Sequence, residues 1–288
     1  GVSGAQITVD PAATRRRIGR LRNYVDKTLL SGDEFLCEHA GGCRASAKSN
    51  HQFREGVMSH VGRRYDLAVR GKPLRIMVVG QESGLPADPN SPWASRVTLS
   101  ARHQQVHDDS GLQRRYYASG DYPGRNPHMR GTTSLLRIIL GAGAGVDYDG
   151  EFVQPANGRR FHCFDGFALV NRLLCSTGPM GTSNGSPTSA MFKNCGGHFV
   201  TTVSILEPTL VILQGKAVAN SVQPLLASSR TYDEHLQRAH IGNNSMLVCN
   251  FSHPSSRGAQ RWGDKPNAEY LQQVVAPTIR NALARLKS

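Results

Sequence analysis

Polar side chains that can do chemistry follow three apolar runs lying far apart in the chain. Gln81 and Glu82 stand in "GQESG", directly after the run 74–80. Asn171 lies inside the run 167–175, and His253 stands in "SHPSSRG" after the run that begins at 245. An amide pairs with an adjacent donor and acceptor, and carboxylates and imidazoles serve acid–base chemistry. If these groups meet, they can bind the polar edge of a small heterocycle.

The elements that position these groups are indicated by hydrophobic patterning. Continuous apolar runs bounded by turns, at 74–80, 167–175, 208–215 and 245–254, are typical of strands buried on both faces of a parallel sheet. Helical patterns at 133–140, 192–206 and 216–226 separate them, and a last helix is interrupted near Pro277. This alternation predicts an α/β sandwich, in which ligands bind beyond the carboxyl ends of the strands.

Two other segments carry basic residues. Asp10 and Pro11 predict the start of a helix over 10–29, whose arginine-rich face, Arg15 to Arg22, would meet either phosphate or solvent. Between 85 and 165 only 133–140 shows a helical pattern, so we expect a long loop there. Its arginines and tyrosines, including Tyr116 and Tyr117, would suit single-stranded nucleic acid.

Composition bounds the class of protein. The 288 residues carry 34 Lys+Arg against 21 Asp+Glu, a formal net charge of +13, which favours a polyanionic partner such as nucleic acid. With 39% hydrophobic and 19% charged residues we expect a globular chain. No apolar run reaches membrane-spanning length, and "GVSGAQITVD" lacks the basic and apolar pattern of a secretory signal, so we expect neither feature. No GxGxxG, Walker-type lysine loop, HExxH or GxSxG occurs, so those nucleotide, zinc-peptidase and serine-hydrolase sites have no support.

Six cysteines are too sparse for a disulfide scaffold of the small secreted type. Two interpretations stay open at this point. The fold could gather thiolates around a metal or an iron–sulfur cluster, or the cysteines could be ordinary core thiols.

Taken in order, four segments resemble motifs of the uracil-DNA glycosylase superfamily, particularly its iron–sulfur branch. The segments are "VVGQESG", "LVNRLLCS", "MFKNCGGHFVTTVSILEPTLVILQGKAVA" and "SHPSSRG". The resemblance covers roughly residues 35–48 and 72–288. It implies a three-layer α/β/α sandwich with a central four-stranded parallel sheet. It divides the chain into an N-terminal helical arm, 1–70, and an α/β domain, 71–288, with an insertion at about 85–130.

The resemblance also implies a [4Fe–4S] cluster held by four cysteines. The matching positions here are Cys37, Cys43, Cys175 and Cys195. Five residues separate the first pair, where the family usually has two, and His39 between them is an alternative ligand. Cys163 and Cys249 are left as core thiols. We expect the cluster to be structural, tying the N-terminal arm to the core.

The activity that the resemblance implies is hydrolysis of the N-glycosidic bond of uracil or a related modified base flipped out of DNA. Asn171 and Gly80 would bind the base, His253 would stabilise its developing charge, and Glu82, with Gln81 as the alternative, would act on water or the sugar cation. Family members carry a Phe before a "G…LL" stretch to stack on the base; "MRGTTSLL" has none, so Tyr122 or Trp93 would substitute. DNA would be gripped by Lys216, Ser255, Ser256, Arg257 and Arg261, with Trp262 as a wedge.

Two alternatives are a non-catalytic nucleic-acid-binding member of the same fold and an iron–sulfur interaction protein that binds another polyanion. They differ from the enzyme in lacking base excision. In each case we expect a cytoplasmic, nucleoid-associated, bacterial-type monomer with DNA or a similar polyanion as partner and no membrane association.

Overall fold

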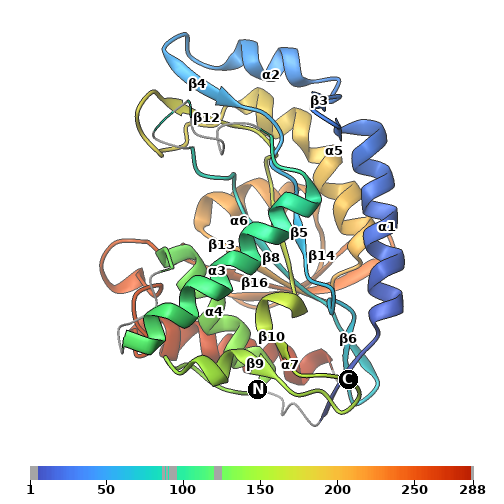
Figure 1. Ribbon diagram of the computed structural model, residues 1–288, viewed down its shortest axis with the longest axis vertical. Coiled ribbons are helices and arrows are strands. Elements are labelled where there is room, and N and C mark those ends of the chain that lie inside the picture. Colours follow the sequence, from blue (N-terminus) through green and yellow to red (C-terminus); the bar gives the residue numbers. More distant parts are fainter. Residues whose placement is uncertain (1–5, 86–87, 89, 91–95, 120–124, 287–288) are drawn as a thin grey trace.

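A seven-stranded mixed sheet forms the centre of the computed structural model, which describes residues 6–85, 88, 90, 96–119 and 125–286 (Figure 1). The four neighbouring strands β16, β13, β8 and β11 run parallel. At the edges, β15 and β5 pair antiparallel with β16 and β11, and β14 pairs antiparallel with β15. In sheet order the strands are β14 (Ala227–Asp233), β15 (Leu236–Ile241), β16 (Asn244–Phe251), β13 (Leu210–Gln214), β8 (Ile76–Gly80), β11 (Ala168–Asn171) and β5 (His60–Val61). All four apolar runs are therefore strands, and the predicted α/β class is confirmed, with a wider, mixed sheet than the one expected.

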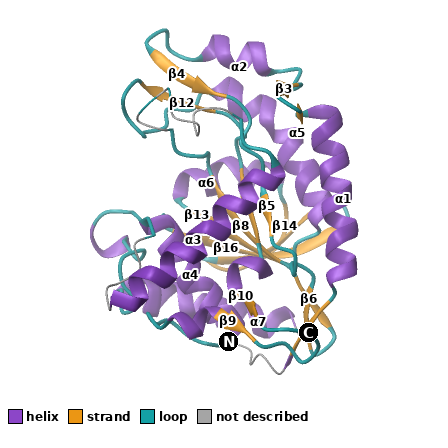
Figure 2. Ribbon diagram, viewed as in Figure 1, coloured by secondary structure: helices purple, strands orange, loops and turns teal. Residues whose placement is uncertain are grey.

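Helices cover both faces of this sheet, because successive side chains of a strand point to opposite faces. On β8, Ile76 and Val78 belong to one core with α4 and α7, while Met77 and Val79 belong to a second core with α1, α5 and α6. Figure 2 shows the strands enclosed between these helices. The bounds are α1 (Pro11–Thr28), α4 (Pro127–Leu140), α5 (Ser189–Leu206), α6 (Lys216–Val222) and α7 (Ala276–Leu286).

The N-terminal helix begins where its sequence predicts. The Asp10 side chain accepts a hydrogen bond from the Ala13 N–H at 3.0 Å, and Pro11 occupies the first turn. Leu21 and Val25 pack into the second core. Arg17 differs from the expectation for this helix: it is buried, with its guanidinium 2.8 Å from the Asp66 carboxylate, so it braces α1 against the core and meets neither phosphate nor solvent.

The expectation of a long loop over 85–165 is wrong in part, because α3 (Leu99–Ser119) is a helix of 21 residues. Of its described side chains, at 99–108 and 110, only Val106 is buried, so this part of α3 shows no buried apolar stripe. Figure 1 shows α3 crossing in front of the central strands.

The predicted interruption near Pro277 is a π-helical turn, Leu271–Val275, which leads directly into α7. A proline lacks the N–H that an α-helix interior needs, and a π turn is one way to accommodate it. Within the described part of the chain, none of the helices combines the length and apolar character that crossing a bilayer requires.

Smaller elements complete the fold. The predicted boundary at residue 70 falls inside the hairpin of β6 and β7, which pair antiparallel. Three further pairs are β2–β3, β4–β12 and β9–β10. The remaining bounds are β1 (Ile7–Val9), β2 (Leu30–Ser31), β3 (Glu34–Phe35), α2 (Ala40–Ser46), β4 (His51–Arg54), β6 (Leu67–Val69), β7 (Lys72–Leu74), β9 (Phe152–Val153), β10 (Phe161–His162) and β12 (Ser176–Pro179), with 3-10 turns at Tyr148–Glu151, Cys163–Gly166, Gln223–Leu225 and Gly258–Gln260.

Candidate functional site

A cavity of about 690 Å³ opens at the carboxyl ends of the parallel strands. Glu82 follows β8, Asn171 ends β11, and His253 follows β16, and all three line this cavity. Gln81, Gly80, Lys216 and Ser255 line it too. The volume lies in the range of about 300–1,000 Å³ that is typical of small-molecule sites. The fold thus brings together side chains that are up to 171 positions apart, between 82 and 253. We call this cavity the strand-end cavity.

Asn171 reaches the cavity because its neighbour is a glycine. The parallel register places Asn171 beside Gly80. A Cβ at Gly80 would lie 3.0 Å from the Asn171 Oδ1, tighter than most real Cβ contacts, and 3.7 Å from the His128 Nε2. Gly80 therefore leaves space for both side chains.

The Glu82 carboxylate is held in a partly desolvated place. Burial raises its pKa above the ordinary value of 4.5, and a hydrogen bond from Gln81 offsets part of that rise. The Glu82 Oε2 and the Gln81 Oε1 are buried without a hydrogen-bond partner among the described residues. Gly185 packs directly on the Glu82 Oε1, where a Cβ would overlap it. Orphaned buried acceptors are rare in folded proteins, and here they line a cavity that a ligand with N–H or O–H groups could enter.

His253 is oriented by the residue two positions after it. The Ser255 backbone N–H donates to the His253 Nδ1 at 3.0 Å, and the Ser255 Oγ lies 2.6 Å from the same nitrogen. Because a backbone N–H can only donate, Nδ1 is an acceptor, and the proton of the neutral ring sits on Nε2. Burial lowers the pKa of His253 below its ordinary value of 6.5, which favours this neutral form at pH 7.

A second imidazole, His128, lines the same cavity and was missed by the sequence reasoning. Its ring centroid lies 5.6 Å from that of His253, and burial lowers its pKa to about 3. α4 begins at this point because the Asn126 side chain accepts a hydrogen bond from the Met129 N–H at 2.9 Å. The available signal was the Pro-His pair directly before "MRGTTSLL". The substitutes predicted for the stacking ring, Tyr122 and Trp93, lie outside the described residues.

Of the residues predicted to contact DNA, Lys216 and Ser255 line the cavity, and the others belong to the loop that follows His253. Lys216 and Arg257 are exposed, and the Ser256 backbone N–H donates to the His253 carbonyl at 2.9 Å. The Arg261 guanidinium donates to the Ser255 carbonyl at 3.0 Å and pairs with Asp264. Arg261 therefore shapes the loop that carries His253.

Trp262 cannot act as the expected wedge. Its side chain is 0% exposed, packs edge-on against Phe251 at 6.1 Å, and donates its indole N–H to the Ser252 carbonyl at 2.9 Å. The side chain is an anchor of the core beneath the His253 loop, because a fully enclosed indole with its polar atom satisfied has no free face.

The four cysteines of the predicted cluster line one narrow pocket, which lies beyond the end of β11. Cys37 follows β3, Cys43 lies in α2, Cys175 precedes β12, and Cys195 lies in α5. Figure 1 shows α2 alongside α5 in this region. Cys163 and Cys249 are buried elsewhere in the first core, as expected for core thiols.

The surroundings of these thiols fit a group that binds thiolates. The Leu174 N–H donates to the Cys195 Sγ at 3.4 Å, and the Asn194 amide donates to the Cys43 Sγ at 3.4 Å. The His198 Nε2 lies 3.3 Å from the Cys37 Sγ. Burial raises the pKa of Cys195 to about 11, so this thiol would ionise at neutral pH only beside a compensating cation. Four cysteines that line one pocket, with N–H donors to their sulfurs, are compatible with the ligand set of an iron–sulfur cluster. His39 also lines the pocket and stays an alternative ligand.

A second group has ligand types suited to a metal ion. The group consists of Glu151, His162 and Cys163. Each contributes one ligand atom, and these three atoms lie within 4.8 Å of one another, so the group could hold an ion. However, the Glu151 Oε1 already lies 2.8 Å from the Arg125 guanidinium and 2.6 Å from the His162 Nε2. A divalent ion at this group would have to sit beside that buried guanidinium charge, which opposes its binding.

A scan against protein-family models and a search of curated proteins found no match for this chain. The geometry of the strand-end cavity and of the four-thiol pocket is therefore what supports a proposal about function.

Proposed function

We propose that this protein is a monofunctional DNA glycosylase, which hydrolyses the N-glycosidic bond of uracil or a related deaminated or modified base. The observation that carries the proposal is the meeting of Glu82, Asn171 and His253 in one strand-end cavity. A carboxylate, an amide and a neutral imidazole are the three groups that this reaction needs. The three-layer sandwich of the uracil-DNA glycosylase superfamily, with β16, β13, β8 and β11 as its parallel sheet, is part of the proposal.

Base binding comes first in the proposed reaction. The target nucleotide leaves the stack, and its base enters the cavity, at a cost of a few kcal/mol for unstacking. The Asn171 side chain offers both a carbonyl and an amide to the base edge. His128 supplies a ring at the cavity wall, the role for which an aromatic residue was sought in the sequence.

Bond cleavage then separates charge. As the bond between C1′ and the base nitrogen breaks, its electron pair leaves with the base, and positive charge grows on the sugar. The Nε2–H of His253 donates a hydrogen bond to the base oxygen, where negative charge develops. Water forms the new bond to C1′ and gives up a proton, for which the Glu82 carboxylate is the acceptor.

Positive charge around the cavity supports a DNA substrate. Arg102 and Lys216 line the cavity itself. An adjoining open cavity shares Gln81 and is lined by Lys193 and Arg172. The Arg172 Nη1 is buried without a partner among the described residues, and a phosphate oxygen would supply one. The net charge of +13 adds a long-range attraction for DNA.

The [4Fe–4S] cluster is the cofactor that we propose for the four-thiol pocket, with Cys37, Cys43, Cys175 and Cys195 as its ligands. When bound, it supplies a cross-link between the N-terminal segment and the core, and base hydrolysis needs no electron from it. Cys175 lies four residues after Asn171, so the pocket also fixes the segment that leaves β11.

The test is base release from defined oligonucleotides. The protein is incubated with single- and double-stranded DNA that contains uracil, hypoxanthine or a modified pyrimidine, followed by alkali to cut abasic sites. Asn171→Ala and His253→Ala should lower cleavage at least about 100-fold while DNA binding keeps its salt dependence. His240→Ala is the matched control, since His240 lies on β15 and does not line the cavity. Strand scission with none of the bases would overturn the proposal in favour of a binding protein.

A further inference from the structure

A second cavity, of about 500 Å³, lies beside the strand-end cavity and shares one wall with it. Val106 of α3 lines both cavities, Arg102 lines the strand-end cavity, and His103 and His107 line the second. Side chains four positions apart lie on the same face of a helix, so two adjacent faces of α3 serve the two cavities. We call the second space the α3 cavity.

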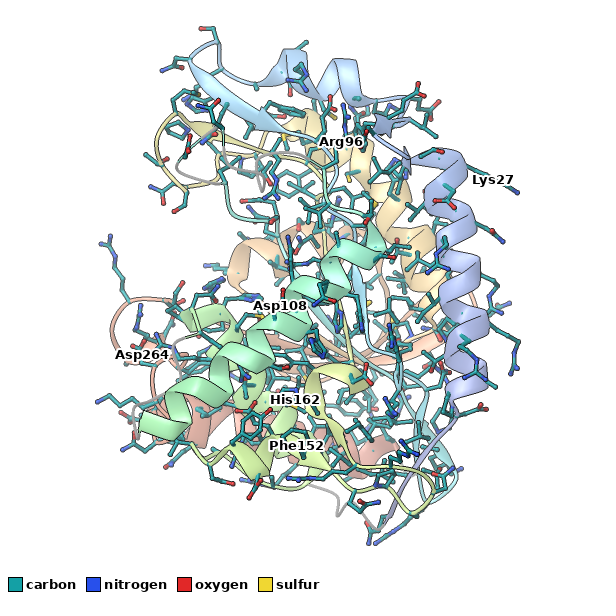
Figure 3. All side chains as sticks on the ribbon, viewed as in Figure 1. Lys27, Arg96, Asp108, Phe152, His162 and Asp264 are labelled. Atoms are coloured by element: carbon teal, nitrogen blue, oxygen red, sulfur yellow. The ribbon has the colours of Figure 1, made fainter. Side chains whose placement is uncertain are left out.

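Aromatic rings form one wall of the α3 cavity. Phe152 lies 5.0 Å from Tyr148 and 5.3 Å from His162, and His162 lies 4.7 Å from Phe164, measured between ring centroids. Figure 3 shows Phe152 and His162 close together beside α3, on which Asp108 is labelled. Tyr148 and Phe152 are only half-buried, so this side of the cavity can offer ring faces to a planar ligand.

Cations outnumber carboxylates in the lining. Arg63, Arg64 and Arg160 line the cavity, whereas Asp165 is its one carboxylate within the described residues. Asp165 is engaged by the Arg64 guanidinium at 2.5 Å and by the Arg63 backbone N–H at 2.7 Å. Arg160 stacks over Phe152 at 4.3 Å from its centroid and pairs with the exposed Asp149 carboxylate at 3.2 Å, whereas no ion pair of the Arg63 side chain is found among the described residues. A guanidinium held against an aromatic ring places positive charge next to the stacking surface.

A buried acceptor completes the lining. The His60 Nε2 lies 2.8 Å from the Phe164 carbonyl oxygen, so this nitrogen carries the proton. The His60 Nδ1 is then an acceptor, and it is buried with no partner among the described residues. The His103 ring stacks on His60 at 5.3 Å. An N–H donor from a ligand is the kind of group that would satisfy this nitrogen.

From this lining we infer that the α3 cavity binds a nucleotide, with the base against the Phe152 wall and the phosphate beside Arg63 and Arg160. The aromatic rings can stack on a base, and the arginines can bind its phosphate. The His60 Nδ1 can accept a hydrogen bond from an N–H group of the base. The inference does not rest on the proposed glycosylase activity, because it concerns a different cavity. The ligand can be a free nucleotide or one nucleotide of a single strand, since both present the same chemistry.

The experiment is titration calorimetry of the full chain with deoxyadenosine monophosphate, deoxyadenosine and inorganic phosphate. We expect saturable binding of the monophosphate and weaker binding of the other two. The double variant Arg63→Gln/Arg160→Gln should weaken the monophosphate about tenfold or more. Both side chains are exposed, so this variant should fold. Phe152→Ala should weaken the monophosphate but leave inorganic phosphate unchanged.

Two controls locate the site. Arg280→Gln, an exposed change on α7, and Asn171→Ala, in the strand-end cavity, should leave the binding unchanged. Titration with a short single-stranded oligodeoxyadenylate shows whether the cavity binds a free nucleotide or one nucleotide of a strand. If the double variant weakens it as much as the monophosphate, the cavity holds a strand; if only the monophosphate is weakened, it holds a free nucleotide. The absence of monophosphate binding at millimolar concentration, or binding that is lost in Asn171→Ala and kept in both α3-cavity variants, would overturn the inference.

Discussion

The Gly185→Ala variant is the sharpest test of the role assigned to Glu82, because it moves the carboxylate without removing it. Gly185 is exposed, and its backbone lies against the Glu82 Oε1, where an added Cβ would overlap the oxygen. The obstructing atom is the end of a flexible side chain, so the overlap can be relieved by rotating Glu82 away. The fold should then survive, and the carboxylate should be displaced by about 1 Å, a misplacement that costs about 100-fold in rate on general grounds.

Single-turnover release of base from an excess of enzyme measures that effect without interference from product release. We expect the Gly185→Ala rate constant to fall by about 100-fold, a loss near 2.7 kcal/mol of transition-state stabilisation. The thermal midpoint should shift by only a few degrees, because the side chain that gives way is at the cavity surface. Gly197→Ala is the matched control, since a Cβ at Gly197 of α5 would meet nothing within 4 Å.

A double-mutant cycle decides whether the loss passes through Glu82. Glu82→Ala should be slow by itself, and adding Gly185→Ala to it should cost little more, because the group that the methyl displaces is already gone. Full additivity of the two changes would show that Gly185 acts on something else. Full activity of Gly185→Ala with a normal midpoint would refute the assigned position of Glu82 in the reaction.

Three further predictions concern the same two sites. The rate should fall as pH decreases through the raised pKa of Glu82, above its ordinary 4.5, because the anion is lost there. Burial lowers the pKa of His253 below 6.5, so its imidazole is neutral at pH 7, and a rate that rises when the pH is lowered from 7 would contradict the role of the neutral form. His128→Ala should raise KM for the modified base, and His128→Phe should restore it if the ring face is what matters, as steady-state kinetics would show. Cys175→Ala should abolish visible absorbance and bound iron in the purified protein, whereas Cys249→Ala, in the core, should keep both; equal iron content in the two variants would count against the four-thiol site.

The parts of the fold that the sequence predicts are those with a strong burial signal. The runs 74–80 and 208–215 become β8 and β13, whose residues are all buried, and uninterrupted apolar stretches cannot be mistaken for surface. β14 is nearly all exposed, and α3 is polar on its described faces, so neither carries a periodic pattern. Both are held by tertiary contacts that no local window contains. The edge strands of the sheet were not predicted for the same reason: their local sequence carries no strong hydrophobic pattern.

The candidate site, like the fold, could be predicted from the sequence only in part. Glu82, Asn171 and His253 could be proposed together because each stands at the end of a strand, and parallel strands end at one edge. His128 enters the cavity from the first turn of α4, and Gly185 from a loop after β12, so no strand-end rule predicts them. Trp262 was wrongly predicted to contact DNA. A tryptophan next to arginines suggests a side chain that inserts between bases, but this one is buried in the core.

The four-thiol pocket and the strand-end cavity are joined by hydrogen bonds of the segment that carries Glu82. The Ser176 Oγ, next to Cys175, donates to the Ser83 carbonyl at 2.7 Å, and Arg54 of β4 donates to the Gly84 carbonyl at 3.0 Å. Both flanking strands, β12 and β4, pair with each other, and β4 follows the segment that bears Cys43. A group that ties the four cysteines together therefore restrains Ser176 and Arg54, and through them the loop of Glu82. The proposed cluster would then influence the proposed catalysis by fixing the position of a carboxylate, with no electron transferred.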